Sequence, residues 1–106
     1  MGEAAGCPSP WNPETSQHSL AVLGKLAEEG SEVATAAVRC IIQGIDECEP
    51  VTGKPNREWL EDEIADVLAQ IERTTYEFDL DVARILRRAN TKYDYTRRWQ
   101  ETLRGK

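Results

Sequence analysis

The chain has very few of the residues that most metal and nucleophile sites use. Its 106 residues include one histidine, His18, and three cysteines, Cys7, Cys40 and Cys48, with no CxxC spacing. A single histidine excludes a multi-histidine metal site and an HExxH protease. An odd number of cysteines without this spacing argues against a disulfide framework and a zinc ribbon, so we expect reduced thiols. Any metal must then be held by oxygen ligands.

Long hydrophobic runs are also missing. No apolar run exceeds a few residues, so we expect no membrane span and no membrane partner. A basic segment followed by an apolar one, which would mark a secretion signal, does not occur either. We therefore expect a cytoplasmic protein, and the length is that of a single domain.

Charge is abundant but unevenly distributed. The net charge is −6, and residues 1–83 hold 17 acidic and 5 basic side chains, whereas residues 84–106 hold 8 basic and 2 acidic ones. Because the overall acidity would repel a polyanion, nucleic acid is not an expected partner. The basic C-terminal block is either a solvated helix face or a source of phosphate contacts for a small ligand.

Apolar residues recur with the 3.6-residue period of a helix in three segments. The first is unusually long, with Asn12 as the expected N-cap and Pro13 at the first helical position, where the missing N–H costs nothing. Gly30 is a point where this helix could be interrupted. We expect Asn56 to cap the second helix and the third to begin at about Asp81. No alternation typical of strands appears.

These segments predict an all-α fold with three main helices. Residues 1–11 are expected to form a flexible arm and residues 12–106 one helical domain. The apolar arc of the first helix is too wide for one chain to bury. Two protomers are therefore expected to complete a four-helix-bundle-like core, as a homodimer or a dimer of dimers.

Two pairs of acidic residues border the apolar faces of the first two helices. The pairs are Glu29 with Glu32 and Glu63 with Asp66, and side chains three apart on a helix have Cβ atoms roughly 5–6 Å apart. If the helices pack antiparallel, the four carboxylates converge. Two charges about 4 Å apart at an effective dielectric near 20 repel by about 4 kcal/mol, so protons or cations must compensate. Mg²⁺, or Mn²⁺, suits these hard oxygen ligands. The alternative is that all four are surface acids.

The acidic motifs resemble a known family. The segments "EEGSE", from Glu28 to Glu32, and "EIAD", from Glu63 to Asp66, are similar to the EExxE…ExxD signature of the MazG-like all-α nucleoside triphosphate pyrophosphohydrolases. The segment "GCPSPWNPETSQHSL" resembles the CPW…QTH.SL stretch before the first helix of that family, and "RRANTKYDYTRR" resembles its basic stretch after ExxD. The resemblance spans roughly residues 7–98 and implies a MazG-like domain over residues 12–106.

This resemblance implies hydrolysis of a nucleoside triphosphate between its α and β phosphates, giving the monophosphate and pyrophosphate. The four paired carboxylates would hold Mg²⁺, and water would attack the α-phosphorus while Glu29 or Glu28 takes its proton. Lys92, with Asn90 and Arg97 as further candidates, would neutralise the departing pyrophosphate. The residue types present are consistent with this reaction in one respect. Phosphoryl transfer needs positioning and charge neutralisation and no protein nucleophile, and the sequence offers no credible activated nucleophile.

Further side chains are candidates for substrate contact. Trp11 and Trp59 could stack on a base, although a tryptophan near a helix start is also typical of a core. His18 could contact sugar or base, or lie on the helix surface. Lys25 could bind substrate, or pair with Glu29 one turn along the helix.

Two other functions are compatible with the same residues. The chain could be a non-catalytic helical dimerisation or interaction module with an acidic surface, whose basic third helix docks an acidic partner. It could also keep the enzyme fold and hydrolyse another small molecule that contains a pyrophosphate group, because function resides in the site and not in the fold.

Overall fold

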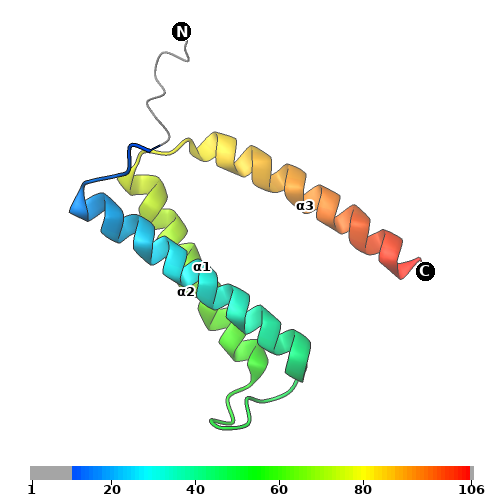
Figure 1. Cartoon of the computed structure of the whole chain (residues 1–106). Coiled ribbons are helices and arrows are strands. Elements are labelled where there is room, and N and C mark those ends of the chain that lie inside the picture. Colours follow the sequence, from blue (N-terminus) through cyan, green and yellow to red (C-terminus); the bar gives the residue numbers. More distant parts are fainter. Residues whose placement is uncertain (1–10, 106) are drawn as a thin grey trace. The chain divides into compact units, whose positions relative to one another are not determined.

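The computed structural model describes residues 11–105, which form three α-helices and no strand. The helices are α1 (Gln17–Gln43), α2 (Asn56–Glu77) and α3 (Val82–Arg104) (Figure 1). The predicted all-α class with three helices is therefore confirmed for this part of the chain. Of the predicted arm, all but Trp11 lies outside the described residues. Within residues 11–105 there is no helix with the length and apolar character needed to cross a membrane.

The first helix begins later than predicted. Ser16 is its N-cap, and the Ser16 side-chain oxygen accepts a hydrogen bond from the Ser19 backbone N–H at 3.2 Å. The prediction of a start at Asn12 and Pro13 is therefore wrong, because a later residue satisfies the first free N–H groups. The helix also runs through Gly30 without interruption, since one glycine weakens a helix by only about 1 kcal/mol.

The role predicted for Asn56 is also wrong. This residue is the first of α2 and does not precede it as a cap. Its side chain is 1% exposed, and its Nδ2 donates a hydrogen bond of 2.9 Å to the backbone carbonyl of Gly44, just after α1. The Asn56 backbone N–H donates to the carbonyl of Glu47 at 2.9 Å. Asn56 therefore ties the start of α2 to the end of α1.

The connection between α1 and α2 is an ordered turn. Gly44 (φ 98°) and Gly53 (φ 77°) adopt the left-handed backbone that glycine reaches without steric cost. The Glu49 carboxylate accepts hydrogen bonds from the Thr52 hydroxyl and from the backbone N–H groups of Val51 and Thr52, at 2.7–2.9 Å. These bonds stabilise the charged form and lower the pKa of Glu49.

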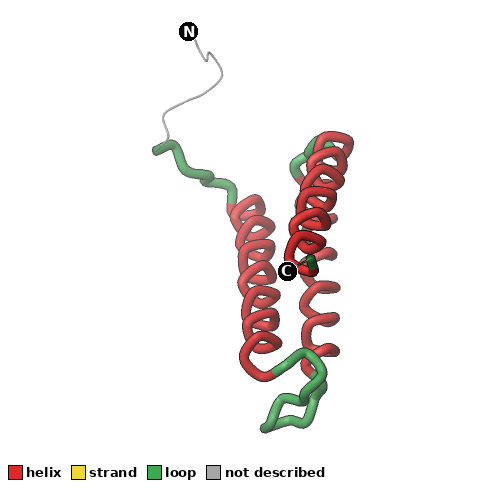
Figure 2. The backbone as a smooth tube through the Cα atoms, turned by 90° about the vertical axis from the view of Figure 1, so that its right-hand side faces the viewer, coloured by secondary structure: helices red, strands yellow, loops and turns green. Residues whose placement is uncertain are grey.

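The helices α1 and α2 lie side by side and run antiparallel (Figures 1 and 2). Glu32 of α1 interacts electrostatically with Glu63 of α2. Seven residues further along α1, the Arg39 guanidinium lies 5.5 Å from the centre of the Trp59 ring. Residues nearer the end of α1 thus contact residues nearer the start of α2, as the antiparallel arrangement requires. We call this line of contacts between α1 and α2 the seam.

The contacts divide the chain into two units, with the boundary after Thr74. The second unit contains α3, which begins next to Asp81, as predicted. Asp81 is its N-cap, because the Asp81 side chain accepts a hydrogen bond from the Arg84 N–H at 3.0 Å. Cys40 and Cys48 in the first unit are free thiols, and Cys7 lies outside the described residues.

A single chain buries very little apolar surface. Among the described residues Ala36 is the one buried apolar side chain, while Ile41 and Ile42 of α1 are 81% and 75% exposed and Leu68 of α2 is 58% exposed. Burial of apolar surface is the dominant favourable term in folding, at about 25 cal/mol per Å². The apolar faces of α1 and α2 are thus largely open to solvent in this single chain, and a surface that covered them would add to the favourable burial.

Asn56 provides a test of how α1 and α2 are joined. In Asn56→Ala the Gly44 carbonyl loses a buried donor, so we expect the free energy of unfolding to fall by about 1–3 kcal/mol. Asn56→Asp, which has nearly the same shape, should be at least as damaging at neutral pH because it turns a carboxylate toward that carbonyl. Urea denaturation measures both.

The matched control for these variants is Arg57→Ala. Arg57 follows Asn56 but is exposed and pairs with Asp46 at 2.6 Å, so its loss should matter less. If all four proteins unfold at the same urea concentration, the Asn56 bond does not hold the two helices together.

Candidate functional site

The four acidic residues of the predicted pairs line the seam between α1 and α2. Glu29 is 7% exposed, Glu63 is half-buried, and Glu32 and Asp66 are exposed. Removal from water raises the pKa of Glu29 above its ordinary value of 4.5. The positive charge of Lys25 opposes this rise, and the negative charges of Glu32 and Asp66 add to it.

Glu63 on the facing helix has a similar environment. Removal from water raises its pKa first, and the charge of Glu32 raises it further. A hydrogen bond with Asp66, the charge of Asp66 and the charge of Glu29 act in the same direction. The four carboxylates thus influence one another across two helices that are joined by the turn after Gln43.

The two lysines near the seam are already paired. Lys25 binds Glu28 at 2.8 Å, and Lys54, which lies within electrostatic range of Glu63, binds Asp62 at 2.6 Å. The seam therefore carries excess negative charge on oxygen atoms, which suits a hard divalent cation. As the side chains stand, residues 11–105 contain no group of three or more His, Cys, Asp or Glu residues with the spacing of a metal site.

The other residues predicted to contact substrate or take a proton, which lie on α1 or just before it, are exposed to solvent. Glu28 is exposed, and its ion pair with Lys25 shows that this lysine pairs with Glu28 and not with Glu29. Trp11 is 88% exposed and precedes α1. His18 is the second residue of α1 and is exposed.

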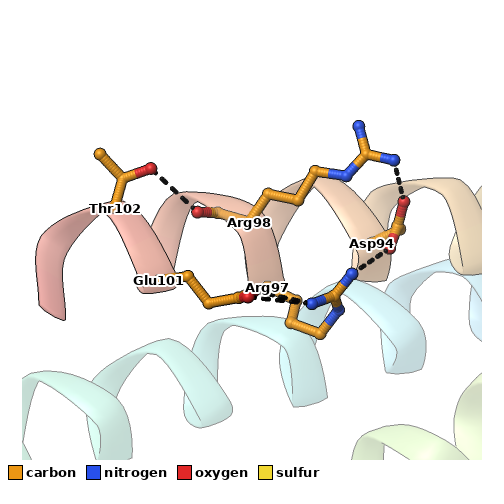
Figure 3. Close-up of polar contacts among 5 residues, drawn as sticks. All are labelled: Asp94, Arg97, Arg98, Glu101 and Thr102. Atoms are coloured by element: carbon orange, nitrogen blue, oxygen red, sulfur yellow. Dashed lines mark hydrogen bonds and ion pairs between the residues drawn. The ribbon is translucent and has the colours of Figure 1, made fainter. Parts of the chain in front are cut away.

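The three candidates for the basic stretch all lie on α3. Asn90, Lys92 and Arg97 are exposed there. The Arg97 guanidinium is held by Asp94 at 2.9 Å and by Glu101 at 2.7 Å (Figure 3). These contacts raise the pKa of Arg97 and occupy the N–H groups that would contact a phosphate. The roles of the three residues toward a substrate stay predictions.

A hollow of about 600 Å³ adjoins the seam. Its lining includes Glu32 and Glu63, and it also contains Arg39 of α1, Trp59 of α2 and residues of the turn. The sequence analysis did not consider Arg39. Its position seven residues after Glu32 was a usable signal, because that spacing places both side chains on one face of a helix.

Comparisons with protein-family models, with curated proteins and with solved structures found no match to this chain. The function proposed below rests on the charge and geometry of the seam and on the resemblance of the two acidic motifs.

The raised pKa of Glu29 predicts how stability depends on pH. A carboxyl whose pKa is higher in the folded state favours folding below its ordinary value of 4.5, and this contribution is lost as the pH rises through the raised folded value. Glu29→Gln cannot ionise. Without divalent cations, it should increase the free energy of unfolding at about pH 7 and change it little at about pH 4. Urea denaturation in EDTA at both pH values measures this.

The matched control is Glu28→Gln, which neutralises the adjacent exposed carboxylate and removes its pair with Lys25. It should give no gain at neutral pH. If Glu29→Gln instead destabilises the protein equally at both pH values, the charge of Glu29 is not what opposes folding.

Proposed function

We propose that the protein is a Mg²⁺-dependent nucleoside triphosphate pyrophosphohydrolase that cleaves a ribo- or deoxyribonucleoside triphosphate to the monophosphate and pyrophosphate. The observation that carries this proposal is the negative charge in the seam, where burial and neighbouring carboxylates raise the pKa values of Glu29 and Glu63. Such charge destabilises a folded chain unless protons or a cation neutralise it. The resemblance of the "EEGSE" and "EIAD" motifs supplies the reaction.

The carboxylates have distinct roles in this proposal. Glu29, Glu32, Glu63 and Asp66 would hold Mg²⁺, or Mn²⁺. When bound, the cation neutralises triphosphate charge and makes water more acidic. Glu29, or Glu28 beside it, accepts the proton of the water that attacks the α-phosphorus. The raised pKa of Glu29 makes its carboxylate a stronger base than an ordinary glutamate.

The resemblance adds three candidates from α3 for contact with the departing pyrophosphate. Lys92 is the first of them, with Asn90 and Arg97 as further candidates. Arg97 is the weakest of the three candidates because Asp94 and Glu101 already bind its guanidinium. Trp11, His18 and Lys25 stay proposed substrate contacts, with no further support in their surroundings.

The proposed enzyme is a homodimer or a dimer of dimers. Large apolar side chains on α1 and α2 are exposed in one chain, with Ile41 at 81%. Two copies of α1 and α2 would supply four helices with apolar faces to a common core. A C₂ dimer uses the same surface twice, so each protomer covers the other.

The exposed apolar faces also favour the alternative of a non-catalytic dimerisation or interaction module. Both functions require association through these faces. Only the enzyme requires a cation site in the seam, so the response to Mg²⁺ separates the two.

A first prediction for the enzyme concerns Mg²⁺. A ligand that binds only the folded state stabilises it by RT ln(1 + [L]/Kd), which is about 2.7 kcal/mol at 100 times Kd. We expect Mg²⁺ to raise the melting temperature, and pyrophosphate release from a panel of nucleoside triphosphates to require it. Glu32→Gln and Glu63→Gln should each abolish the thermal shift and lower kcat/KM by about 100-fold or more.

The control is Glu61→Gln, which removes an exposed acid of α2 two residues before Glu63. It should keep both the thermal shift and the activity. Full activity in Glu32→Gln and Glu63→Gln would refute the carboxylate assignment. A protein that binds no Mg²⁺ and releases no pyrophosphate would be the interaction module.

A second prediction concerns the dimer. Leu68→Lys places a charge on the exposed apolar face of α2, so we expect sedimentation velocity to show a shift from dimer toward monomer, with a lower melting temperature. Val51→Lys is the control, because Val51 is 89% exposed but lies in the turn. It should sediment as the unchanged protein does. If the unchanged protein is a stable monomer at micromolar concentration, the dimer proposal is wrong.

A further inference from the structure

The hollow beside the seam extends from the carboxylates toward the turn. Arg39 lies seven residues after Glu32 on α1, which is about 10 Å along the helix at 1.5 Å per residue. Trp59 lies four residues before Glu63, which is about 6 Å in the same direction because α2 runs antiparallel. A ligand held at the carboxylate end therefore has open space next to it, bordered by Arg39 and Trp59.

The hollow is bordered by a guanidinium that lacks a hydrogen-bond partner among residues 11–105. This group belongs to Arg39, which lines the hollow and lies 5.5 Å from the centre of the Trp59 ring. Arg39 is half-buried, and in the same part of the chain it forms no ion pair or hydrogen bond. By contrast, Lys54, whose Nζ lies 4.4 Å from the centre of the Trp59 ring, is bound to Asp62.

The charge of the residues that line the hollow indicates what kind of ligand group fits in it. Glu32, Glu63 and Glu49 line the hollow together with Arg39, so the excess negative charge opposes an additional phosphate there. The Glu49 carboxylate is already used as an acceptor, because its oxygens accept bonds from its own turn. The apolar surface of Ala36 and the Trp59 ring favours a neutral planar group with hydrogen-bond acceptors on its edge.

We propose that this hollow is the nucleobase site of the nucleotide substrate and that Arg39 selects guanine over adenine. Guanine presents two adjacent acceptors, O6 and N7, which match the paired N–H groups of a guanidinium. Adenine has an amino donor in place of O6 and would leave an Arg39 donor unpaired. The inference rests on the proposed function for the identity of the ligand, and it adds the base preference and two residues, Arg39 and Trp59, that contact the base.

Trp59 fluorescence gives a direct measurement of binding. The chain has three tryptophans, so Trp11→Phe with Trp99→Phe leaves Trp59 as the single reporter. Because Trp11 is itself a proposed substrate contact, both analogues and all Arg39 variants are compared in this same background. We expect the non-hydrolysable α,β-methylene analogue of GTP, with Mg²⁺, to quench this fluorescence with a Kd about 10–100-fold lower than that of the ATP analogue. Arg39→Gln should remove the difference between the two analogues.

Two more variants make the result specific. Arg39→Lys keeps the charge but not the fork of two N–H groups, so it should also lose the preference. Arg57→Gln is the matched control, since Arg57 lies in the same unit but is bound to Asp46, and it should keep the preference. Circular dichroism and melting temperature establish that each variant is folded. A preference for the GTP analogue that survives in Arg39→Lys and Arg39→Gln would overturn the proposal.

Steady-state kinetics distinguishes a failure of this inference from a failure of the proposed function. We expect Arg39→Gln to lower kcat/KM for GTP by about 10–100-fold and to leave that for ATP nearly unchanged. An equal loss for both nucleotides means that Arg39 acts on the shared phosphates, which overturns the base site and leaves the enzyme intact. Guanine-selective quenching without any pyrophosphate release supports the base site and refutes the hydrolase.

Discussion

Repulsion among carboxylates in the seam of α1 and α2 is the constraint on which the rest of this structure depends. Glu29 is buried, Glu63 is half-buried, and both have raised pKa values because they are removed from water beside other acids. The nearby lysines relieve this repulsion only in part: the charge of Lys25 lowers the pKa of Glu29, but Lys25 and Lys54 are bound to acids outside the seam. Such an arrangement lowers the stability of the folded chain unless protons or a cation neutralise it.

The same two helices also bury few apolar side chains. One chain buries Ala36 as the sole apolar side chain among residues 11–105, yet its helices must hold repelling carboxylates close together. Association of apolar faces would add stabilisation, and cation binding would remove part of the repulsion. Folding, assembly and ligand binding are then thermodynamically linked, because each favours the same arrangement of α1 and α2.

The start of α3 depends on residues close in sequence and was predictable, whereas the start of α1 and the role of Asn56 were not. The third helix begins at about Asp81 as expected, and the Asp81 side chain caps it by accepting a hydrogen bond from the Arg84 N–H. The start of α1 was misplaced because Asn12, Pro13 and Ser16 are all residues typical of helix starts, and only the position of the Ser16 oxygen against the Ser19 N–H distinguishes them. Asn56 looked like a cap for its own helix, but the turn brings the Gly44 carbonyl to its side chain.

The sequence by itself determined the helical class, the start of α3 and the placing of two acid pairs at helix-neighbour spacing, because all of these follow from interactions within a few residues. Only the tertiary structure decided that Glu29 is buried, that Glu32 interacts with Glu63, and that Arg39 lies over Trp59. These contacts join residues about 20–35 positions apart. They depend on the register between two helices, which the turn and the Asn56 bond set and which periodicity within either helix does not specify.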